Sequence, residues 1–231
     1  MRADETPGEL PVHITASGIT LDGTLGVPLP AGVPARAVVL FAHGSGSSRF
    51  SPRNRFVAAS LRRSGFATLL LDLLTPAEES VDLRTRELRF DLDLLADRLV
   101  DATGWLAHQE ATHGLPIGLF GASTGGGAAL MAAARRPKEI RAVVSRGGRP
   151  DLAGDALGAV TAPTLLIVGG NDQTVIELNR QAMDRMKGEV RLEIVPGATH
   201  LFEEPGALDT VTQLARAWFV KYLAPGVQRR P

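Results

Sequence analysis

The chain has 231 residues, enough for a full sheet-based core, and carries 25 basic and 25 acidic side chains. This charge balance argues against binding nucleic acid or a membrane through a global field, and the absence of cysteine excludes disulfides, thiolate catalysis and cysteine metal sites. No apolar leader follows the N-terminal charges, and no stretch reaches the ~20 apolar residues of a membrane span, so we expect a cytoplasmic protein.

Short apolar, β-branched runs alternate with longer segments of helical periodicity. This alternation predicts an α/β protein with a mostly parallel sheet and helices on both faces. The predicted strands are 12–16, 19–27, 37–42, 66–72, 116–120, 140–145, 164–169 and 190–195. The predicted helices are 52–64, 84–109, an alanine-rich segment that ends before Pro137, 174–187 and 207–222. We expect the first two strands to be antiparallel, because they are close together and Asp22-Gly23 is a turn signal.

No repeat or long linker divides the chain, so we expect a single domain over residues 1–231, with flexible ends at about 1–11 and 224–231. Residues 147–163 are rich in Gly, Pro and Ala. A stretch of this length holds a loop with one short helix, but it is too short for a large lid domain.

The segment Gly121-Ala-Ser-Thr-Gly125 joins a predicted buried strand to the alanine-rich helix. It matches G-x-S-x-G, in which a sharp strand-to-helix turn strains the backbone and exposes a serine hydroxyl. Glycines two residues before and after Ser123 permit a backbone approach that side chains would block. The alternative is a glycine-rich packing turn with an incidental serine. A phosphate-binding loop is rejected, because no Lys-Ser/Thr pair and no G-x-G-x-x-G spacing is present.

Ser123 needs a base, and in the α/β-hydrolase fold the partners follow in the order Ser, Asp or Glu, His. Asp172 and His200 each follow a predicted strand, where open α/β sheets place their sites. In the predicted acyl transfer, His200 takes the proton of Ser123, and Asp172 orients the imidazole. The alternatives are a helix N-cap for Asp172 and an ordinary loop histidine for His200. Asp72 also ends a strand, but it precedes Ser123 and ranks below Asp172.

A tetrahedral oxyanion needs two hydrogen-bond donors. One predicted donor is the backbone N–H of Thr124, at the N-terminus of the helix behind the serine. The other comes from the loop His43-Gly-Ser-Gly46, with the N–H of Ser45 as first choice and that of Gly46 as second.

Six segments together resemble the dienelactone-hydrolase-related α/β-hydrolases: His43-Gly-Ser-Gly-Ser-Ser-Arg49, Ser51-Pro-Arg-Asn-Arg55, Leu71-Asp-Leu-Leu-Thr-Pro76, Gly121-Ala-Ser-Thr-Gly125, Ser145-Arg-Gly-Gly-Arg149 and Pro196-Gly-Ala-Thr-His-Leu-Phe202. Within that family the chain is most similar to a bacterial subgroup found alone or fused to phosphoribosyltransferase domains. The resemblance covers about residues 12–222 and implies an eight-stranded fold with the triad Ser123, Asp172 and His200. Dienelactone hydrolases proper use a cysteine nucleophile, which this chain lacks, so ordinary esters are favoured over cyclic dienelactones.

Arginines gather near the expected mouth of the site. Arg49, Arg53 and Arg146 are the candidates for binding an anionic part of the substrate, because guanidinium groups bind carboxylate or phosphate in bidentate fashion. The alternative is that these arginines pair with acids such as Glu78, Glu79 or Asp91, or point to water.

The sequence therefore predicts a serine hydrolase that cleaves carboxylic esters of small to medium acyl groups without cofactor or metal. The expected partner is a small-molecule ester, neutral or anionic, with no nucleic acid and no membrane, and the protein is a monomer or a homodimer. The low aromatic content of 5% and the lack of a lid argue against a lipase. A thioesterase or acyltransferase with the same triad, and a non-catalytic binding module on a hydrolase scaffold, are the alternative functions.

Overall fold

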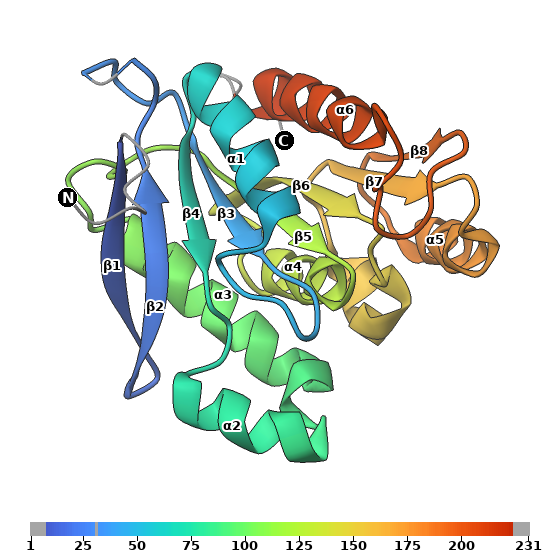
Figure 1. Cartoon of the computed structure of the whole chain (residues 1–231), viewed down its shortest axis with the longest axis horizontal. Coiled ribbons are helices and arrows are strands. Elements are labelled where there is room, and N and C mark those ends of the chain that lie inside the picture. The colour runs from blue at the N-terminus through green and yellow to red at the C-terminus, as the bar shows by residue number, and fades with distance from the viewer. Residues whose placement is uncertain (1–7, 31, 224–231) are drawn as a thin grey trace.

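The computed structural model describes residues 8–30 and 32–223, which contain an eight-stranded sheet (Figure 1). The strands lie in the order β1-β2-β4-β3-β5-β6-β7-β8. The first pairs, β1 with β2 and β2 with β4, are antiparallel, and all other neighbours are parallel. The strand bounds are β1 (Glu9–Ala16), β2 (Ile19–Gly26), β3 (Val38–Ala42), β4 (Ala67–Leu71), β5 (Ile117–Ala122), β6 (Ile140–Arg146), β7 (Thr164–Gly169) and β8 (Val190–Val195). This confirms the predicted mostly parallel sheet.

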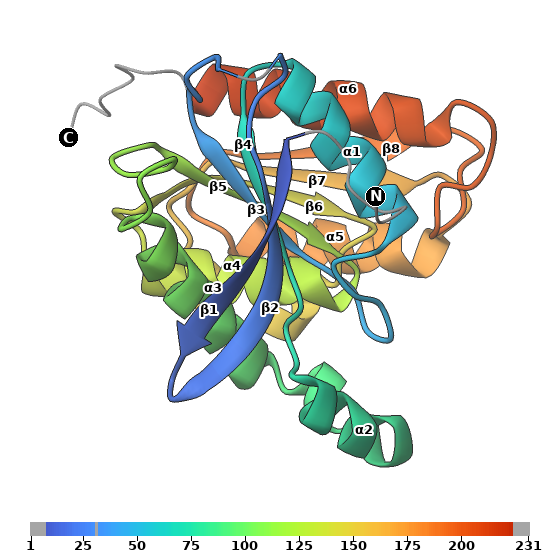
Figure 2. The same cartoon turned by 60° about the vertical axis from the view of Figure 1, so that its left-hand side comes forward.

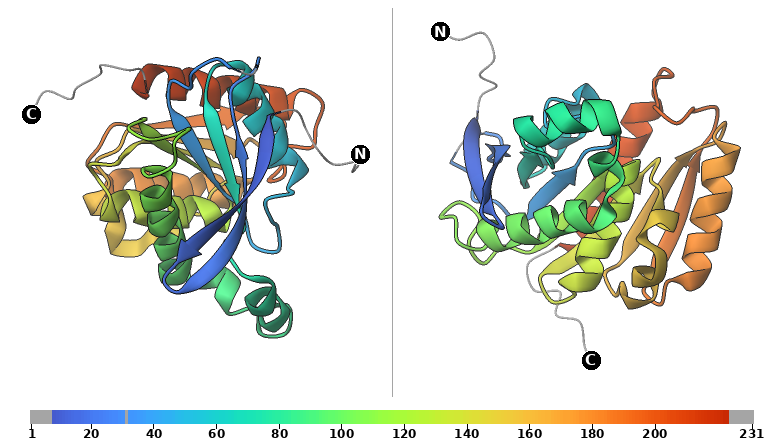
Figure 3. Two further views of the ribbon diagram at one scale, coloured as in Figure 1. Left: turned by 90° about the vertical axis from the view of Figure 1, so that its left-hand side faces the viewer. Right: turned by 90° about the horizontal axis from the view of Figure 1, so that it is seen from below.

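The helices form a layer on each face of the sheet. Helices α1 (Pro52–Arg63) and α6 (Ala207–Tyr222) cover one face, and α3 (Leu92–Leu106), α4 (Thr124–Arg135) and α5 (Gln173–Arg185) cover the other (Figures 1 and 3). The central strands β3, β4, β5 and β7 are buried along their whole length. Strands of a parallel sheet that is covered on both faces are continuously apolar, so these strands can be predicted from apolar runs in the sequence.

The predicted helix over residues 84–109 is wrong in its first part. The structure has helix α2 (Pro76–Thr85), a 3-10 turn η1 (Leu88–Phe90) and then α3. Arg86 ends α2 in the left-handed region at φ 58°, and the Asp91 carboxylate caps α3 by accepting from the N–H of Leu94 at 3.0 Å. Helix α2 lies at the margin of the molecule, away from the sheet (Figure 2).

The first hairpin is antiparallel as predicted, but its turn lies elsewhere. Ser17 and Gly18 make the turn, both with positive φ, whereas Asp22 and Gly23 lie inside β2. Strand β1 begins at Glu9, so the flexible end predicted to residue 11 is wrong for residues 9–11. The rest of the predicted flexible ends, residues 1–7 and 224–231, lies outside the described residues.

The stretch predicted to be too short for a lid carries only η2 (Pro150–Ala159), a 3-10 segment interrupted at Gly154. Within residues 8–30 and 32–223, none of the helices combines the length and the apolar character that crossing a bilayer demands.

Candidate active site

Ser123 occupies the sharp turn between β5 and α4. Its backbone has φ 50° and ψ −123°, a strained conformation for a residue other than glycine. A Cβ atom at Gly121 would lie 2.4 Å from the carbonyl oxygen of Gly125, and one at Gly125 would lie 2.4 Å from that of Ala42. The glycines are therefore required by close backbone approach, as the motif predicts.

Asp172 and His200 leave the carboxyl ends of β7 and β8 and meet beside Ser123. His200 Nδ1 donates to Asp172 Oδ2 at 2.6 Å, and Ser123 Oγ donates to His200 Nε2 at 3.3 Å. A carboxylate only accepts hydrogen bonds, so the proton lies on Nδ1 and leaves Nε2 free to accept one. Asp172 precedes α5, but its side chain makes no cap hydrogen bond there, which answers the helix N-cap alternative.

The loops that carry Asp172 and His200 are hydrogen-bonded to each other. Asn171 donates from its backbone N–H to the carbonyl of Ala198 at 2.9 Å and from its side chain to that of Gly197 at 2.9 Å. A Cβ at Gly169 would lie 2.5 Å from the carbonyl of Ala198, so this position also permits a close backbone approach. These contacts fix the acid and the histidine relative to each other.

A cavity of about 240 Å³ opens beside Ser123. It is lined by side chains and backbone from the loop after β3, from α1, from the ends of β5 and β6 and from the His200 loop: Gly44, Ser45, Ser47, Ser51, Arg53, Asn54, Ala122, Ser123, Arg146, His200 and Leu201. The buried residue Asn54 was missed from the sequence, because nothing in a helical segment of that composition marks one polar residue as facing a site.

The predicted oxyanion donors lie in different positions relative to this cavity. Thr124 is the first residue of α4, so its N–H has no acceptor within the helix. Ser45 lines the cavity, whereas Gly46 does not and lies on the other side of the loop. Gly44 is the residue against the nucleophile, since a Cβ there would lie 3.1 Å from Ser123 Cβ.

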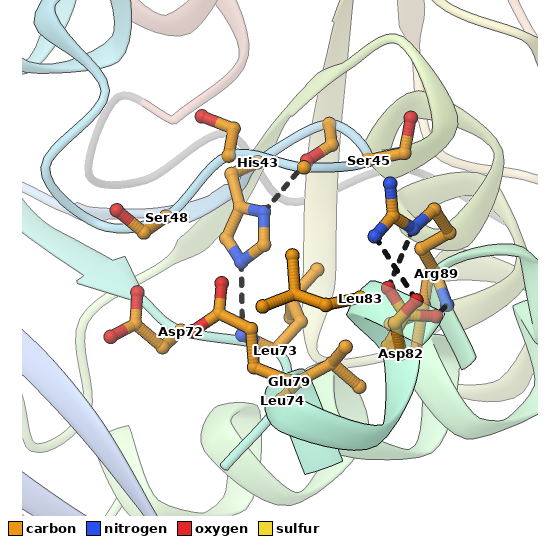
Figure 4. Close-up of a pocket in the computed structure, with 14 residues that line it drawn as sticks. His43, Ser45, Ser48, Asp72, Leu73, Leu74, Glu79, Asp82, Leu83 and Arg89 are labelled. Carbon is orange, nitrogen blue, oxygen red and sulfur yellow. Dashed lines mark hydrogen bonds and ion pairs between the residues drawn. The ribbon is translucent and has the colours of Figure 1, made fainter. Parts of the chain in front are cut away.

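His43 holds this loop in place and was not singled out from the sequence (Figure 4). Its Nδ1 donates to the carbonyl of Gly44 at 2.9 Å, and its Nε2 accepts from the N–H of Leu73 at 3.1 Å. Burial lowers the pKa of the imidazole, which keeps the ring neutral and able to do both. The ring borders a second, smaller cavity of about 80 Å³ between the loop and α2.

The predicted anion-binding arginines differ in their partners. Arg49 pairs with Asp72, which removes Asp72 as an alternative triad acid and leaves Arg49 outside the nucleophile cavity. Arg53 lines the cavity and forms an ion pair with Glu203 at 3.0 Å. Arg146 also lines the cavity and is 7% exposed. The acids suggested from the sequence, Glu78, Glu79 and Asp91, are not the partners of these three arginines.

The sheet order, the strained serine turn after β5, and the acid and histidine after β7 and β8 define the α/β-hydrolase fold, here without a lid in the described residues. The family profile described as "Dienelactone hydrolase family" matches residues 21–219. The chain belongs to the dienelactone hydrolase family and is an α/β-hydrolase.

Two sequence relatives are similar to nearly the whole of this chain. Two Mycobacterium tuberculosis proteins named as phosphoribosyl transferases are 59% identical over 216 residues, which are 93% of this chain and 47% of theirs. The chain thus spans about half the length of these relatives, consistent with the resemblance to hydrolases fused to phosphoribosyltransferase domains.

Solved structures give the same result. A dienelactone hydrolase from Anabaena variabilis is 58% identical and superposes with a TM-score of 0.90 over 95% of this chain and 100% of that one. A Xanthomonas campestris protein described as an α/β serine hydrolase without lid shares the fold, with 18% identity and a TM-score of 0.75 over 97% of this chain and 99% of that one.

Proposed function

We propose that the chain is a serine esterase that cleaves carboxylic esters of small to medium acyl groups through an acyl-enzyme on Ser123. The observation that carries this proposal is the continuous hydrogen-bonded series from Asp172 through His200 to the Ser123 hydroxyl, with steps of 2.6 Å and 3.3 Å. A hydroxyl becomes nucleophilic when a neighbouring base removes its proton as the new bond forms.

In the proposed reaction, His200 Nε2 takes the proton of Ser123 while Oγ attacks the ester carbonyl. Asp172 stabilises the imidazolium, and the N–H groups of Thr124 and Ser45 bind the oxyanion. His200 then gives the proton to the leaving alcohol, and a water molecule, activated by the same imidazole, releases the acid. One oxyanion donor typically contributes about 3–4 kcal/mol to lowering the barrier.

The size of the cavity supports small substrates. A volume of about 240 Å³ lies just below the range of roughly 300–1,000 Å³ that is typical of pockets for drug-sized ligands. The Anabaena relative is named for an activity on a lactone, which is an internal ester, and this too supports ester chemistry.

Labelling with a fluorophosphonate, followed by peptide mass mapping, tests the nucleophile directly. We expect one adduct on Ser123 in the wild type and none in Ser123→Ala. Hydrolysis of p-nitrophenyl esters from acetate to octanoate should fall as the chain outgrows the cavity, and Ser123→Ala should lose about 10⁴-fold or more in kcat. Absence of labelling with intact folding would favour the binding-module alternative, and product analysis with added thiol or alcohol separates hydrolysis from acyl transfer.

A further inference from the structure

Arg146 differs from Arg53, the other arginine that lines the nucleophile cavity, and from the arginines near these two in the sequence, in having no carboxylate partner. Arg53, Arg55 and Arg149 form ion pairs at 3.0, 3.3 and 2.7 Å, and Arg49 pairs with Asp72. No acidic side chain in the described ranges 8–30 and 32–223 lies within ion-pair distance of Arg146.

The hydrogen-bonding capacity of Arg146 is largely unused. Nη2 reaches Asn54 Oδ1 at 3.5 Å, the outer limit of a hydrogen bond, and the guanidinium stands 5.9 Å from the centre of the Phe202 ring. Nε is buried and has no partner. Burial of an uncompensated cation is strongly destabilising, so the position calls for a ligand that supplies the missing negative charge.

The electrostatic surroundings of Arg146 favour an anion. Burial and then the neighbouring Arg53 guanidinium lower the pKa of Arg146 to about 10, which still leaves the side chain protonated at neutral pH. The Arg146 cation, which has no carboxylate partner, therefore lies in the same small cavity as Ser123 and His200, together with Arg53, which is paired with Glu203. Arg53 and Arg146 line the nucleophile cavity, which α1 also borders. Helix α2 borders only the second, smaller cavity, on the other side of the loop after β3.

We propose that Arg146 is a specificity-determining residue that binds an anionic group of the ester substrate, a carboxylate or a phosphate, on the α1 side of Ser123. Nε and one Nη of the guanidinium form a fork that matches two oxygens of such a group. Arg53 lines the same cavity, but its charge is already paired with Glu203. Arg146, Ser123 and His200 line one cavity, so the anionic group and the reacting carbonyl of the substrate would share that cavity. This inference rests on the proposed esterase function and adds the charge of the substrate to it.

Three methyl esters of similar length test the proposal: neutral methyl pentanoate, monomethyl glutarate and methyl 4-phosphonobutanoate. Hydrolysis is followed by methanol release. We expect the wild type to prefer an anionic ester, and the ratio between the carboxylate and the phosphonate ester to identify the source of the negative charge. Equal kcat/KM for all three esters would overturn the proposal and leave the esterase function standing.

Arg146→Met removes the charge and keeps most of the volume, so folding should survive, and a urea unfolding curve checks this. We expect kcat/KM to fall about 10- to 100-fold on the preferred anionic ester and to change less than about threefold on methyl pentanoate. Arg146→Lys should recover part of the loss.

Arg149→Gln is the matched control, because it removes a nearby arginine that already pairs with Asp151, and it should leave the substrate preference unchanged. An equal loss on neutral and anionic esters in Arg146→Met would mean a structural role and would overturn the proposal.

Measuring anion binding in a variant that cannot turn over substrate separates the proposed anion site from the proposed esterase function. Calorimetric titration of Ser123→Ala with glutarate or 4-phosphonobutyrate should detect binding that disappears when Arg146→Met is added. If wild-type protein hydrolyses methyl pentanoate but Ser123→Ala binds neither anion, the anion site is wrong and the esterase stands. If no ester is hydrolysed and no fluorophosphonate adduct forms, the proposed function is wrong, and the titration still decides whether Arg146 binds anions.

Discussion

Gly125 lies so close to Ala42 that no side chain fits between them. A Cβ atom at Gly125 would be 2.4 Å from the carbonyl oxygen of Ala42 and 2.5 Å from that of His43. The start of α4 therefore packs directly against the end of β3, and this contact sets the position of the nucleophile relative to the loop that follows β3.

Gly125→Ala should destabilise the protein by about 1–3 kcal/mol, because the obstructing atoms are backbone and can move only with the sheet. Urea unfolding measures the effect. Gly104→Ala is the matched control: Gly104 lies within α3, and a Cβ there meets nothing within 4 Å. It should stabilise the helix by roughly 0.5–1 kcal/mol. Equal effects at both positions would contradict the packing argument.

Asp172→Asn should lower kcat for ester hydrolysis by about 10⁴-fold with little loss of stability, because an amide can hold the imidazole in the wrong tautomer. Asp72→Asn provides the comparison, since Asp72 pairs with Arg49 instead of a histidine next to the nucleophile. Initial rates on p-nitrophenyl acetate check both variants. A larger loss in Asp72→Asn than in Asp172→Asn would show that the acid is wrongly assigned.

The stability of the protein should depend on pH through His43. Burial lowers the pKa of His43 in the folded state, so below about pH 6.5 the unfolded chain binds a proton that the folded protein does not. Stability from this residue is therefore complete above pH 6.5 and is lost as the pH falls toward the folded-state pKa, by at most about 1.4 kcal/mol per pH unit. Unfolding at pH 7.5 and 5.5 should show a larger loss in the wild type than in His43→Gln. Parallel losses in the two proteins would rule out the buried neutral ring.

Glu9 anchors the first strand to α1 through the buried Arg62, whose side chain is 0% exposed. Glu9→Gln removes the charge from this contact and should cost roughly 3 kcal/mol of unfolding free energy, because a buried guanidinium remains. Glu193→Gln, in an ion pair with the exposed Arg191, should change stability by no more than about 1 kcal/mol. Thermal unfolding measures the stability of both variants. A similarly small loss in Glu9→Gln and Glu193→Gln would contradict the anchoring role of Glu9.

Much of the sheet and the nucleophile turn could be predicted from local sequence. Strands such as β3 and β7 are continuous apolar runs, and Gly121 and Gly125 mark a turn whose geometry only glycine permits. Helix α2 was missed although Thr75 and Glu78 form a capping box at its start. The apolar residues of α2 do not follow a helical period, because the helix lies away from the core and exposes Val81 and Leu83.

The arginines could not be assigned from sequence for a different reason. Arg49 and Asp72 are brought together only when the ends of β3 and β4 become neighbours, and Glu203 reaches Arg53 across 150 positions of the chain. Whether an arginine is paired depends on such long-range contacts, so the unpaired state of Arg146 is visible only in the folded structure.

The hydrogen bonds of Asn171 join the loops after β7 and β8, which carry Asp172 and His200, while Ser123 lies on the turn between β5 and α4. A displacement of this turn relative to the two joined loops would change the Oγ–Nε2 separation before it changed the Nδ1–Oδ2 hydrogen bond. Substitutions in β6, the strand between β5 and β7, are therefore the place to tune the hydrogen bond of the serine hydroxyl without disturbing the Asp172–His200 pair.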